Sequence, residues 1–309
     1  MRERKMQERK MQNATTGGEA YARTKYREYP VREDCELLDF LMREGYSRNK
    51  AKDILQGHGV MVDRRLVTRH DHPLRAGQTV LVSRHRRKTE LESQWLKIIY
   101  EDKDIVVIDK QPGILSMGTS ARQFTVKTVL DEYFERRHFQ CHAHVVHRLD
   151  RDTSGLMVYA KTIEAARVLE RDWKGRVFDR RYVALVSGVI EQEGGTLESY
   201  LKDDQIGVTR SSPTDNDGKL ATTHFRVVER LEGRTLVELR LETGRKNQIR
   251  VQMADLGHPV CGDKKYGLRG DDPIHRLCLH AYRLYLYHPT TGLRMEFETP
   301  YPTAFRRLG

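Results

Sequence analysis

The sequence predicts an α+β fold with a largely antiparallel mixed sheet, preceded by a smaller N-terminal domain. Short segments that alternate apolar and polar residues dominate the chain, and helical patterns are few. Charged turns separate several of these segments, which is typical of hairpins in antiparallel sheets. Neither glycine-rich phosphate loop of the nucleotide-binding folds is present. Together these observations favour the α+β class.

The composition combines a sizeable core with a strongly basic surface. Of 309 residues, 38% are hydrophobic and 32% charged, and the net charge is +11. This balance favours a polyanionic partner, with nucleic acid first and an anionic membrane surface second. No apolar run approaches the roughly 18 residues of a membrane-spanning helix. The N-terminus also lacks the apolar core of a signal peptide, so we expect no membrane partner.

The four cysteines lie far apart in the sequence, at Cys35, Cys141, Cys261 and Cys278. None belongs to a C-x-x-C pair, so the sequence predicts neither a disulfide framework nor a zinc ribbon. This pattern indicates a reducing compartment. We expect a monomer in the cytoplasm.

Residues 1–30 form a basic tail with eight Lys/Arg, four Glu and almost no aliphatic side chains other than Met. Such a segment buries too little apolar surface to offset its ordering entropy, so we expect it to be mobile. A role in contacting RNA phosphates and a merely solubilising role are equally compatible with this composition.

Residues 31–84 have the pattern of a small domain. Leu37, Leu38 and Leu41 predict a helix that ends near Gly45, and Ser47 is a good N-cap for a second helix through Gln56. Short strands are expected over 60–62, 66–67 and within 74–82. This order resembles the S4 RNA-binding domain, and the resemblance implies an exposed RNA-binding helix face at Arg48, Lys50 and Lys52. A solvated helix face is the alternative.

Residues 85–94 form a basic linker that includes Arg86 and Arg87. These two arginines could lie along a phosphate backbone, although such a run is more often a simple linker.

Residues 95–309 form the large domain, in which strands and loops alternate. Segments 98–100 and 105–108 flank a charged turn and predict a hairpin. Further strands are expected over 156–160, 182–188, 222–228, 235–241, 282–287 and 295–297. Helices are expected over 126–136, from Thr162 through Trp173 to a stop at Gly175, and over 247–256.

The most informative stretch is His147-Arg148-Leu149-Asp150-Arg151-Asp152-Thr153-Ser154-Gly155, which leads into the apolar run 156–160. Its composition is that of a loop feeding a buried strand, and chemistry is often carried on such loops. Asp, Ser, Thr and Gly are also ordinary turn residues, so composition alone favours a solvated turn.

This stretch resembles the signature of the RluA family of RNA pseudouridine synthases. Other motifs follow in the family's order over about residues 95–302: Tyr100-Glu101-Asp102 with Lys110 and Gly113, 182–186 with Gly188, Thr243-Gly244-Arg245 with Gln248-Ile249-Arg250, 256–259 with Gly262-Asp263 and Tyr266-Gly267, and Leu279-His280-Ala281 with His288-Pro289. The resemblance implies the family's α+β catalytic fold. An S4 domain in front of it is a known arrangement in the family.

The resemblance also implies the site residues. Asp150 is then the catalytic carboxylate, Tyr182 stacks on the base and takes part in C5 deprotonation, and Arg250 pairs with Asp150 and keeps it ionised. Ile249 would wall the uracil pocket. Arg148 would fill the space that a flipped base leaves, with a structural salt bridge as its alternative.

Several assignments stay open at this stage. Lys110 could contact a phosphate or simply end its strand. Asn247 stands where many family members have histidine, and Gln111 interrupts the commoner Lys-Pro-x-Gly motif. His142, His144 and His147 fit no clear metal-site spacing.

The resemblance implies an isomerase that converts uridine to pseudouridine. The reaction gains no atoms, so no cofactor and no metal are expected. Large-subunit ribosomal RNA is the favoured substrate and tRNA the second. Two rival functions are a non-catalytic RNA-binding ribosome-assembly protein and a hydrolase that uses Asp150 and Asp152 as paired carboxylates.

Overall fold

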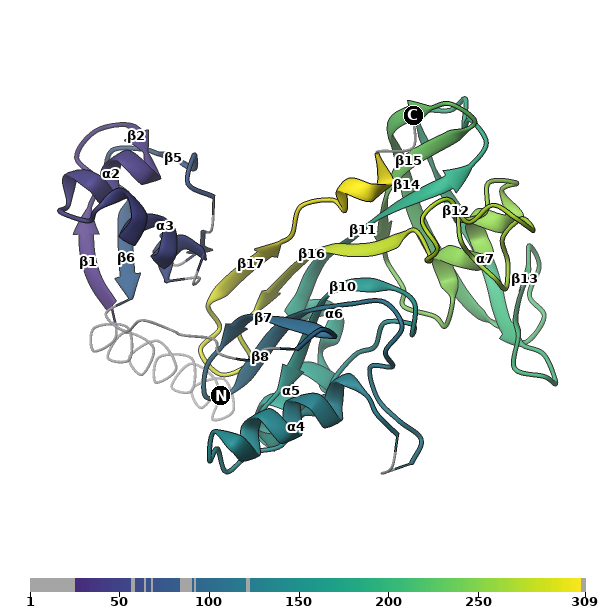
Figure 1. The fold of residues 1–309 in the computed structure, drawn as a ribbon, viewed down its shortest axis with the longest axis horizontal. Helices are drawn as coiled ribbons and strands as arrows, with labels where there is room; N and C mark the ends of the chain where they lie inside the picture. Colours follow the sequence, from purple (N-terminus) through teal and green to yellow (C-terminus); the bar gives the residue numbers. More distant parts are fainter. Residues whose placement is uncertain are drawn as a thin grey trace, which may run out of the picture.

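The computed structural model describes residues 26–56, 59–63, 65–67, 69–83, 91, 93–120 and 123–306. Most of the predicted tail, residues 1–25, lies outside the described residues, as do Arg86 and Arg87 of the predicted linker. Figure 1 shows a small N-terminal sheet region, residues 26–83, beside a large twisted sheet that extends through the rest of the chain.

The N-terminal region combines two helices with short strands. Its elements are β1 (Tyr26–Pro30), β2 (Cys35–Glu36), α2 (Leu37–Arg43), α3 (Arg48–Gln56), β3 (Val60–Val62), β4 (Arg65–Leu66), β5 (Pro73–Leu74) and β6 (Thr79–Ser83). Four strands pair in the order β1-β6-β3-β4, and β2 pairs with β5. Both predicted helices are present. The side chain of Ser47 accepts a hydrogen bond from the Lys50 N–H at 3.3 Å, as expected of an N-cap.

The assignment of residues 26–30 to the tail was wrong, because they form β1. This strand pairs antiparallel with β6, from Tyr26 opposite Ser83 to Pro30 opposite Thr79. Its two tyrosines supply the packing that aliphatic residues usually provide: Tyr29 packs on the N-terminal core and Tyr26 on the neighbouring cluster. Pro30 is tolerated because it lies at the end of an edge strand.

The main sheet confirms the predicted α+β class. Its strands are β7 (Leu96–Glu101), β8 (Ile105–Lys110), β9 (His144–Val145), β10 (Ser154–Ala160), β11 (Val177–Ser187), β12 (Gly194–Asp203), β13 (Thr209–Ser212), β14 (Lys219–Leu231), β15 (Arg234–Leu241), β16 (Leu279–Tyr287) and β17 (Arg294–Glu298). The order is β13-β12-β14-β15-β11-β16-β10-β8-β7, with β17 on β16 and β9 on β10. Only β10 and β16 pair in parallel among the described strands.

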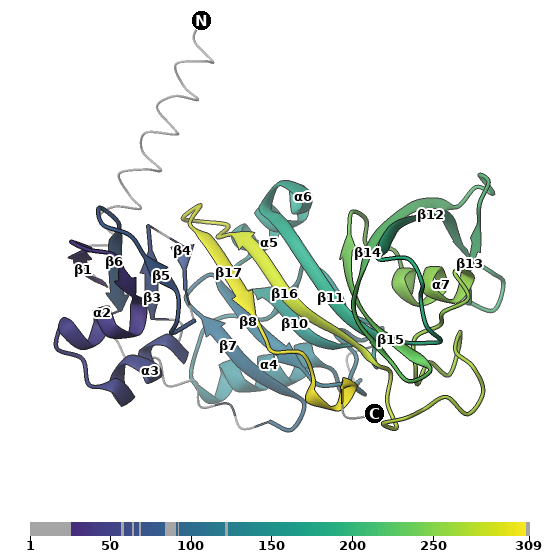
Figure 2. The same ribbon diagram turned by 90° about the horizontal axis from the view of Figure 1, so that it is seen from above.

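Few helices accompany this sheet. They are α4 (Val126–Arg136), α5 (Ile163–Arg171), α6 (Trp173–Arg176), α7 (Gln248–Asp255) and the short η1 (Thr303–Phe305). The bounds of α4 are those predicted, and Thr125 and Thr128 form a capping box at its start. Figure 2 shows α7 inside the curve that β12, β14 and β15 form at one end of the sheet.

The single helix predicted from Thr162 to Gly175 is instead two. It breaks at Asp172, whose carboxylate accepts a hydrogen bond from the Gly175 N–H at 3.1 Å and caps the short α6. Trp173 begins the second helix and lies on a cavity wall.

Strands β12 and β13 were missed because their sequences are polar. Most of β12 is exposed, so its pairing rests on the backbone ladder with β14 rather than on apolar alternation. The buried Leu201 of β12 packs with Val251 of α7, which ties this end of the sheet to the helix.

An apolar cluster joins the N-terminal region to the main sheet. Met61, Leu66 and Leu81 share one buried cluster with Met295 and Phe297 of β17. No helix among the described residues is long and apolar enough to cross a membrane.

Candidate active site

A cavity of about 360 Å³ opens beside the central strands β15, β11 and β16 of the main sheet. Its lining comes from the loop before β10, from α6 and β11, and from the segment between β15 and α7. Five sequence-predicted site residues lie in this lining: Arg148, Asp150, Tyr182, Ile249 and Arg250. Tertiary folding therefore brings together three motifs that span about one hundred residues of sequence.

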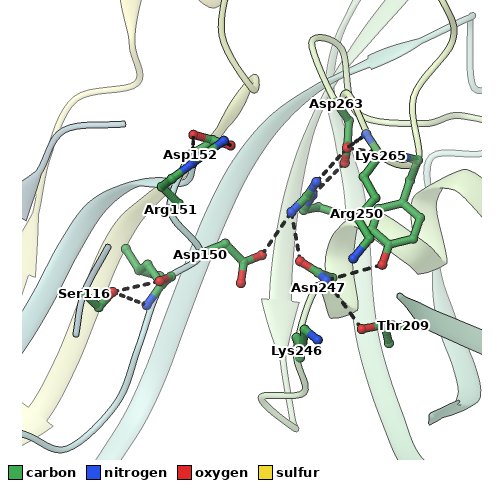
Figure 3. A network of polar contacts seen from close by, with 12 residues as sticks. Ser116, Asp150, Arg151, Asp152, Thr209, Lys246, Asn247, Arg250, Asp263 and Lys265 are labelled. Carbon is green, nitrogen blue, oxygen red and sulfur yellow. Dashed lines mark hydrogen bonds and ion pairs between the residues drawn. The ribbon is translucent and has the colours of Figure 1, made fainter. Parts of the chain in front are cut away.

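The loop that carries Asp150 is held in place by Ser116 and by the start of β10. Ser116 Oγ donates to the Leu149 carbonyl at 2.7 Å and accepts from the Leu149 N–H at 3.1 Å (Figure 3). Gly155 has a φ of +117° opposite Ala281, where a Cβ would collide with the Ala281 backbone. Only glycine permits this close approach at a positive φ, so the loop enters the sheet at a fixed point.

Arg250 lies opposite Asp150 and is itself firmly held. Its Nη1 is 3.6 Å from Asp150 Oδ2, while Nε and Nη2 donate to the two oxygens of Asp263 at 2.7 Å each. Nη1 also donates to Asn247 Oδ1 at 2.8 Å. The side chain of Asp263 is 0% exposed, and the Arg250 guanidinium holds the pKa of that carboxyl below its usual range despite burial. The guanidinium is thus a preorganised cation facing Asp150.

Asp263 was part of a quoted motif and Asn247 was noted as a departure from the family's common histidine, but neither received a role from the sequence. Asn247 has a left-handed φ of +53° at the start of α7, and its side-chain amide lies near Tyr266 and Thr209. The residue that departs from the family's common histidine therefore orients Arg250. Its signal was its position three residues before Arg250, on the first turn of a helix.

The second carboxylate of the loop does not share the cavity. The side chain of Asp152 points away from Asp150 (Figure 3) and pairs with Arg151 at 3.0 and 3.1 Å. It is absent from the residues that line the cavity. This geometry does not support a hydrolase with Asp150 and Asp152 as paired carboxylates.

The floor of the cavity is apolar and buried. Tyr182 is 7% exposed, Ile249 4% and Leu279 3%. Burial raises the pKa of the Tyr182 hydroxyl, so the phenol is neutral near pH 7. Flat, apolar walls beside a charged pair suit a nucleobase with its sugar at the carboxylate.

Arg148 lies at the exposed rim of the same cavity. Within the described residues it has no ion pair, so the salt-bridge alternative finds no partner there. Arg48, Lys50 and Lys52 are all exposed on α3, and their RNA-binding role stays a prediction.

The predicted substrate contact of Lys110 is not supported by its position. Its side chain is fully buried, and Nζ donates to the carbonyls of Gln111, Ile114 and Arg151 at 2.9 to 3.0 Å. Burial lowers the pKa of this ammonium to about 7. Because three carbonyls surround it, Lys110 holds the loop after Asp150 rather than a ligand.

The three histidines considered for a metal do not converge. His147 Nε2 accepts from the Val158 N–H at 3.0 Å, and desolvation lowers its pKa to about 3, so the ring is neutral. His142 instead lies 3.8 Å from Asp131 with its side chain 81% exposed.

The class of protein follows from the fold and this site together. The family model of RNA pseudouridylate synthase matches residues 104–255, which hold the Asp150 loop, Tyr182 and Arg250. This chain is also similar to the solved structure of human RNA Pseudouridylate Synthase Domain Containing 1, with a TM-score of 0.57 and 28% sequence identity. The match covers 69% of this chain and 86% of the human chain.

Relatives in sequence indicate which pseudouridine synthases this chain is similar to. Ribosomal large subunit pseudouridine synthase D of Nitrosomonas europaea is 38% identical over 74% of this chain and 67% of its own length. The enzyme of the same name from Haemophilus influenzae is 35% identical over 85% of this chain and 86% of its own. This chain belongs to the RluA family of RNA pseudouridine synthases, which are intramolecular isomerases.

We expect Lys110→Met to lower both stability and rate. The three carbonyls would lose a buried donor, which costs roughly 1–3 kcal/mol of unfolding free energy. Loosening the Asp150 loop would slow pseudouridine formation by about 10- to 100-fold. Denaturant unfolding and single-turnover rates measure the two effects.

The matched control is Lys97→Met, on the exposed face of the neighbouring strand β7, which should change neither quantity. A folded Lys110→Met enzyme with the wild-type rate would contradict the loop-holding role. A weaker salt dependence of RNA binding in that variant would instead support the phosphate contact.

Proposed function

We propose that this enzyme isomerises specific uridines to pseudouridine in large-subunit ribosomal RNA. The observation that carries the proposal is the Asp150–Arg250 pair at 3.6 Å on the wall of a cavity with an apolar floor. The RNA class is supported by the names of the relatives, which describe synthases of the ribosomal large subunit.

The chemistry assigns one task to each group. The N1–C1′ bond of the uridine breaks, the uracil turns, C5 bonds to C1′, and the C5 proton is lost to the solvent while N1 gains one. Asp150 supplies the carboxylate at the ribose, either as a nucleophile at C1′ or as a base. Arg250 keeps this carboxylate ionised and oriented. Tyr182 stacks on the uracil and, as a neutral phenol, takes part in deprotonating C5 by passing the proton on to the solvent.

RNA binding completes the proposal. A base in structured RNA must leave its stack to enter the cavity, and Arg148 at the rim fills the vacated space by cation–π stacking. The N-terminal region serves as an S4-like RNA-binding domain, with Arg48, Lys50 and Lys52 exposed on α3. The net charge of +11 supplies long-range attraction to RNA.

The test is a map of pseudouridine in all cellular RNA, with and without the gene. We expect one or more sites in large-subunit ribosomal RNA to disappear and to return when the wild-type gene is restored. Loss of sites in tRNA alone would overturn the substrate class. If no site disappears, the proposed activity itself is wrong.

A further inference from the structure

One half-buried cation of the cavity has no hydrogen bond and no ion pair within the described residues. Arg180 lies on β11, two residues before Tyr182, and lines the same cavity. Within the described residues its guanidinium forms no hydrogen bond and no ion pair, and it lies over the Trp173 ring, 5.5 Å from the ring centroid. A half-buried guanidinium has five N–H donors, so this one requires an acceptor from outside the chain.

The guanidinium is nevertheless held in place. Trp173 lies under it and stacks in turn on the ring of His147, with centroids 4.7 Å apart and planes at 34°. On the other side, both terminal nitrogens of Arg180 come within 3.5–3.6 Å of the point where a Cβ on Gly244 would lie. Arg180 thus reaches across the cavity, between the Trp173 ring and the Gly244 backbone.

Arg148, Lys174 and Arg245 also line the cavity without an ion pair among the described residues, but these three residues are exposed to water. The remaining charged groups of the cavity are paired. Lys246 Nζ pairs with Asp203 at 2.8 Å, and Arg250 pairs with Asp263 and Asp150. The acid Glu242 pairs with His224 Nε2 at 2.6 Å. Arg180 therefore faces the cavity as a half-buried positive charge that no ion pair within the described residues compensates.

The position of Arg180 in the cavity and the shape of its guanidinium indicate which ligand it binds. The buried floor at Tyr182 and Ile249 suits the base, Asp150 marks the ribose, and Arg180 lies half-buried between this floor and the exposed rim residues Arg148 and Lys174. A phosphodiester follows the ribose in that order. A guanidinium fork matches two phosphate oxygens in a bidentate contact, and stacking on an aromatic ring keeps its plane fixed.

We propose that Arg180, supported by Trp173, binds a phosphate that flanks the target uridine. This assignment rests on the proposed function. The cavity then has two cations with separate roles: Arg180 binds the RNA backbone, and Arg250 serves the catalytic carboxylate. Arg180 is a substrate-binding residue that fixes the depth to which the nucleotide enters.

The test measures the salt dependence of RNA binding. Large-subunit ribosomal RNA from a strain that lacks the gene is the probe, and all proteins carry Asp150→Asn so that the RNA is not converted. Loss of one phosphate contact lowers the slope of log Kd against log salt by about 0.7 to 0.9. For Arg180→Gln we expect this decrease in slope together with weaker binding at low salt. For Arg180→Lys, which keeps the charge, we expect a slope close to that of the background protein, which carries Asp150→Asn alone.

The matched control is Arg136→Gln, which removes the same charge from the exposed surface of α4, where Arg136 forms an i,i+4 pair with Glu132. Its slope should equal that of the background. If Arg180→Gln leaves the slope unchanged, the proposal is overturned. Weaker binding with an unchanged slope would indicate that Arg180 contacts uracil. Unchanged binding with an unchanged slope would indicate a purely structural arginine. The slope is read without any conversion of uridine, so this failure is distinct from a failure to find pseudouridine sites.

Discussion

Asp150→Asn is expected to slow pseudouridine formation by about 10³-fold or more, because it removes the carboxylate that faces Arg250 in the cavity and leaves an amide that can act neither as nucleophile nor as base. The substitution is nearly isosteric and the side chain is partly exposed, so the folded state should persist. Single-turnover measurements on ribosomal RNA from the deletion strain give the rate.

Asp152→Asn is the matched control, two residues further along the same loop. Among the described residues Asp152 pairs with Arg151 alone, at the surface, so this variant should retain the wild-type rate within about twofold. Equal losses in the two variants would revive a paired-carboxylate mechanism. An Asp150→Asn enzyme that restores pseudouridine would remove Asp150 from the chemistry.

Arg250→Gln is expected to affect both stability and activity strongly. It leaves the fully buried Asp263 carboxylate without its partner, and breaking a buried ion pair costs about 3–5 kcal/mol of unfolding free energy. It also removes the cation that faces Asp150, so we expect the rate to fall by about 100-fold or more at a temperature where the variant is still folded. Denaturant unfolding and single-turnover kinetics measure the two effects separately.

The double variant Arg250→Gln with Asp263→Asn separates the two effects. Removing both buried charges avoids the unpaired carboxylate, so most of the lost stability should return. The rate should stay low, because the cation beside Asp150 is still missing. If the rate recovers together with stability, Arg250 serves the fold and has no direct role toward Asp150.

Local patterns made much of the fold predictable. Val126–Arg136 has an apolar stripe and a capping threonine, and the helix has the predicted bounds. The 101–104 turn between two apolar segments folds as the expected hairpin. Such features depend on residues close in sequence, and hydrophobic periodicity and capping report on them directly.

Polar strands and helix breaks were harder to predict. Strand β12 is held by backbone hydrogen bonds to β14 and shows little apolar alternation. The break at Asp172 depends on one side chain that caps its own next turn. Neither signal is distinguishable from an ordinary loop or helix in sequence alone.

By itself, the sequence determined the class of fold and the identity of the Asp150, Tyr182 and Arg250 motifs, because the residue types and their order along the chain carry that information. Only the tertiary structure decided what each side chain contacts. Lys110 lies buried among three carbonyls, Asn247 orients Arg250, and Arg180 lies over Trp173 with no ion pair in the described part of the chain. These roles depend on contacts between segments distant in sequence, and a side chain's charge has its effect only through the burial and partners that packing provides.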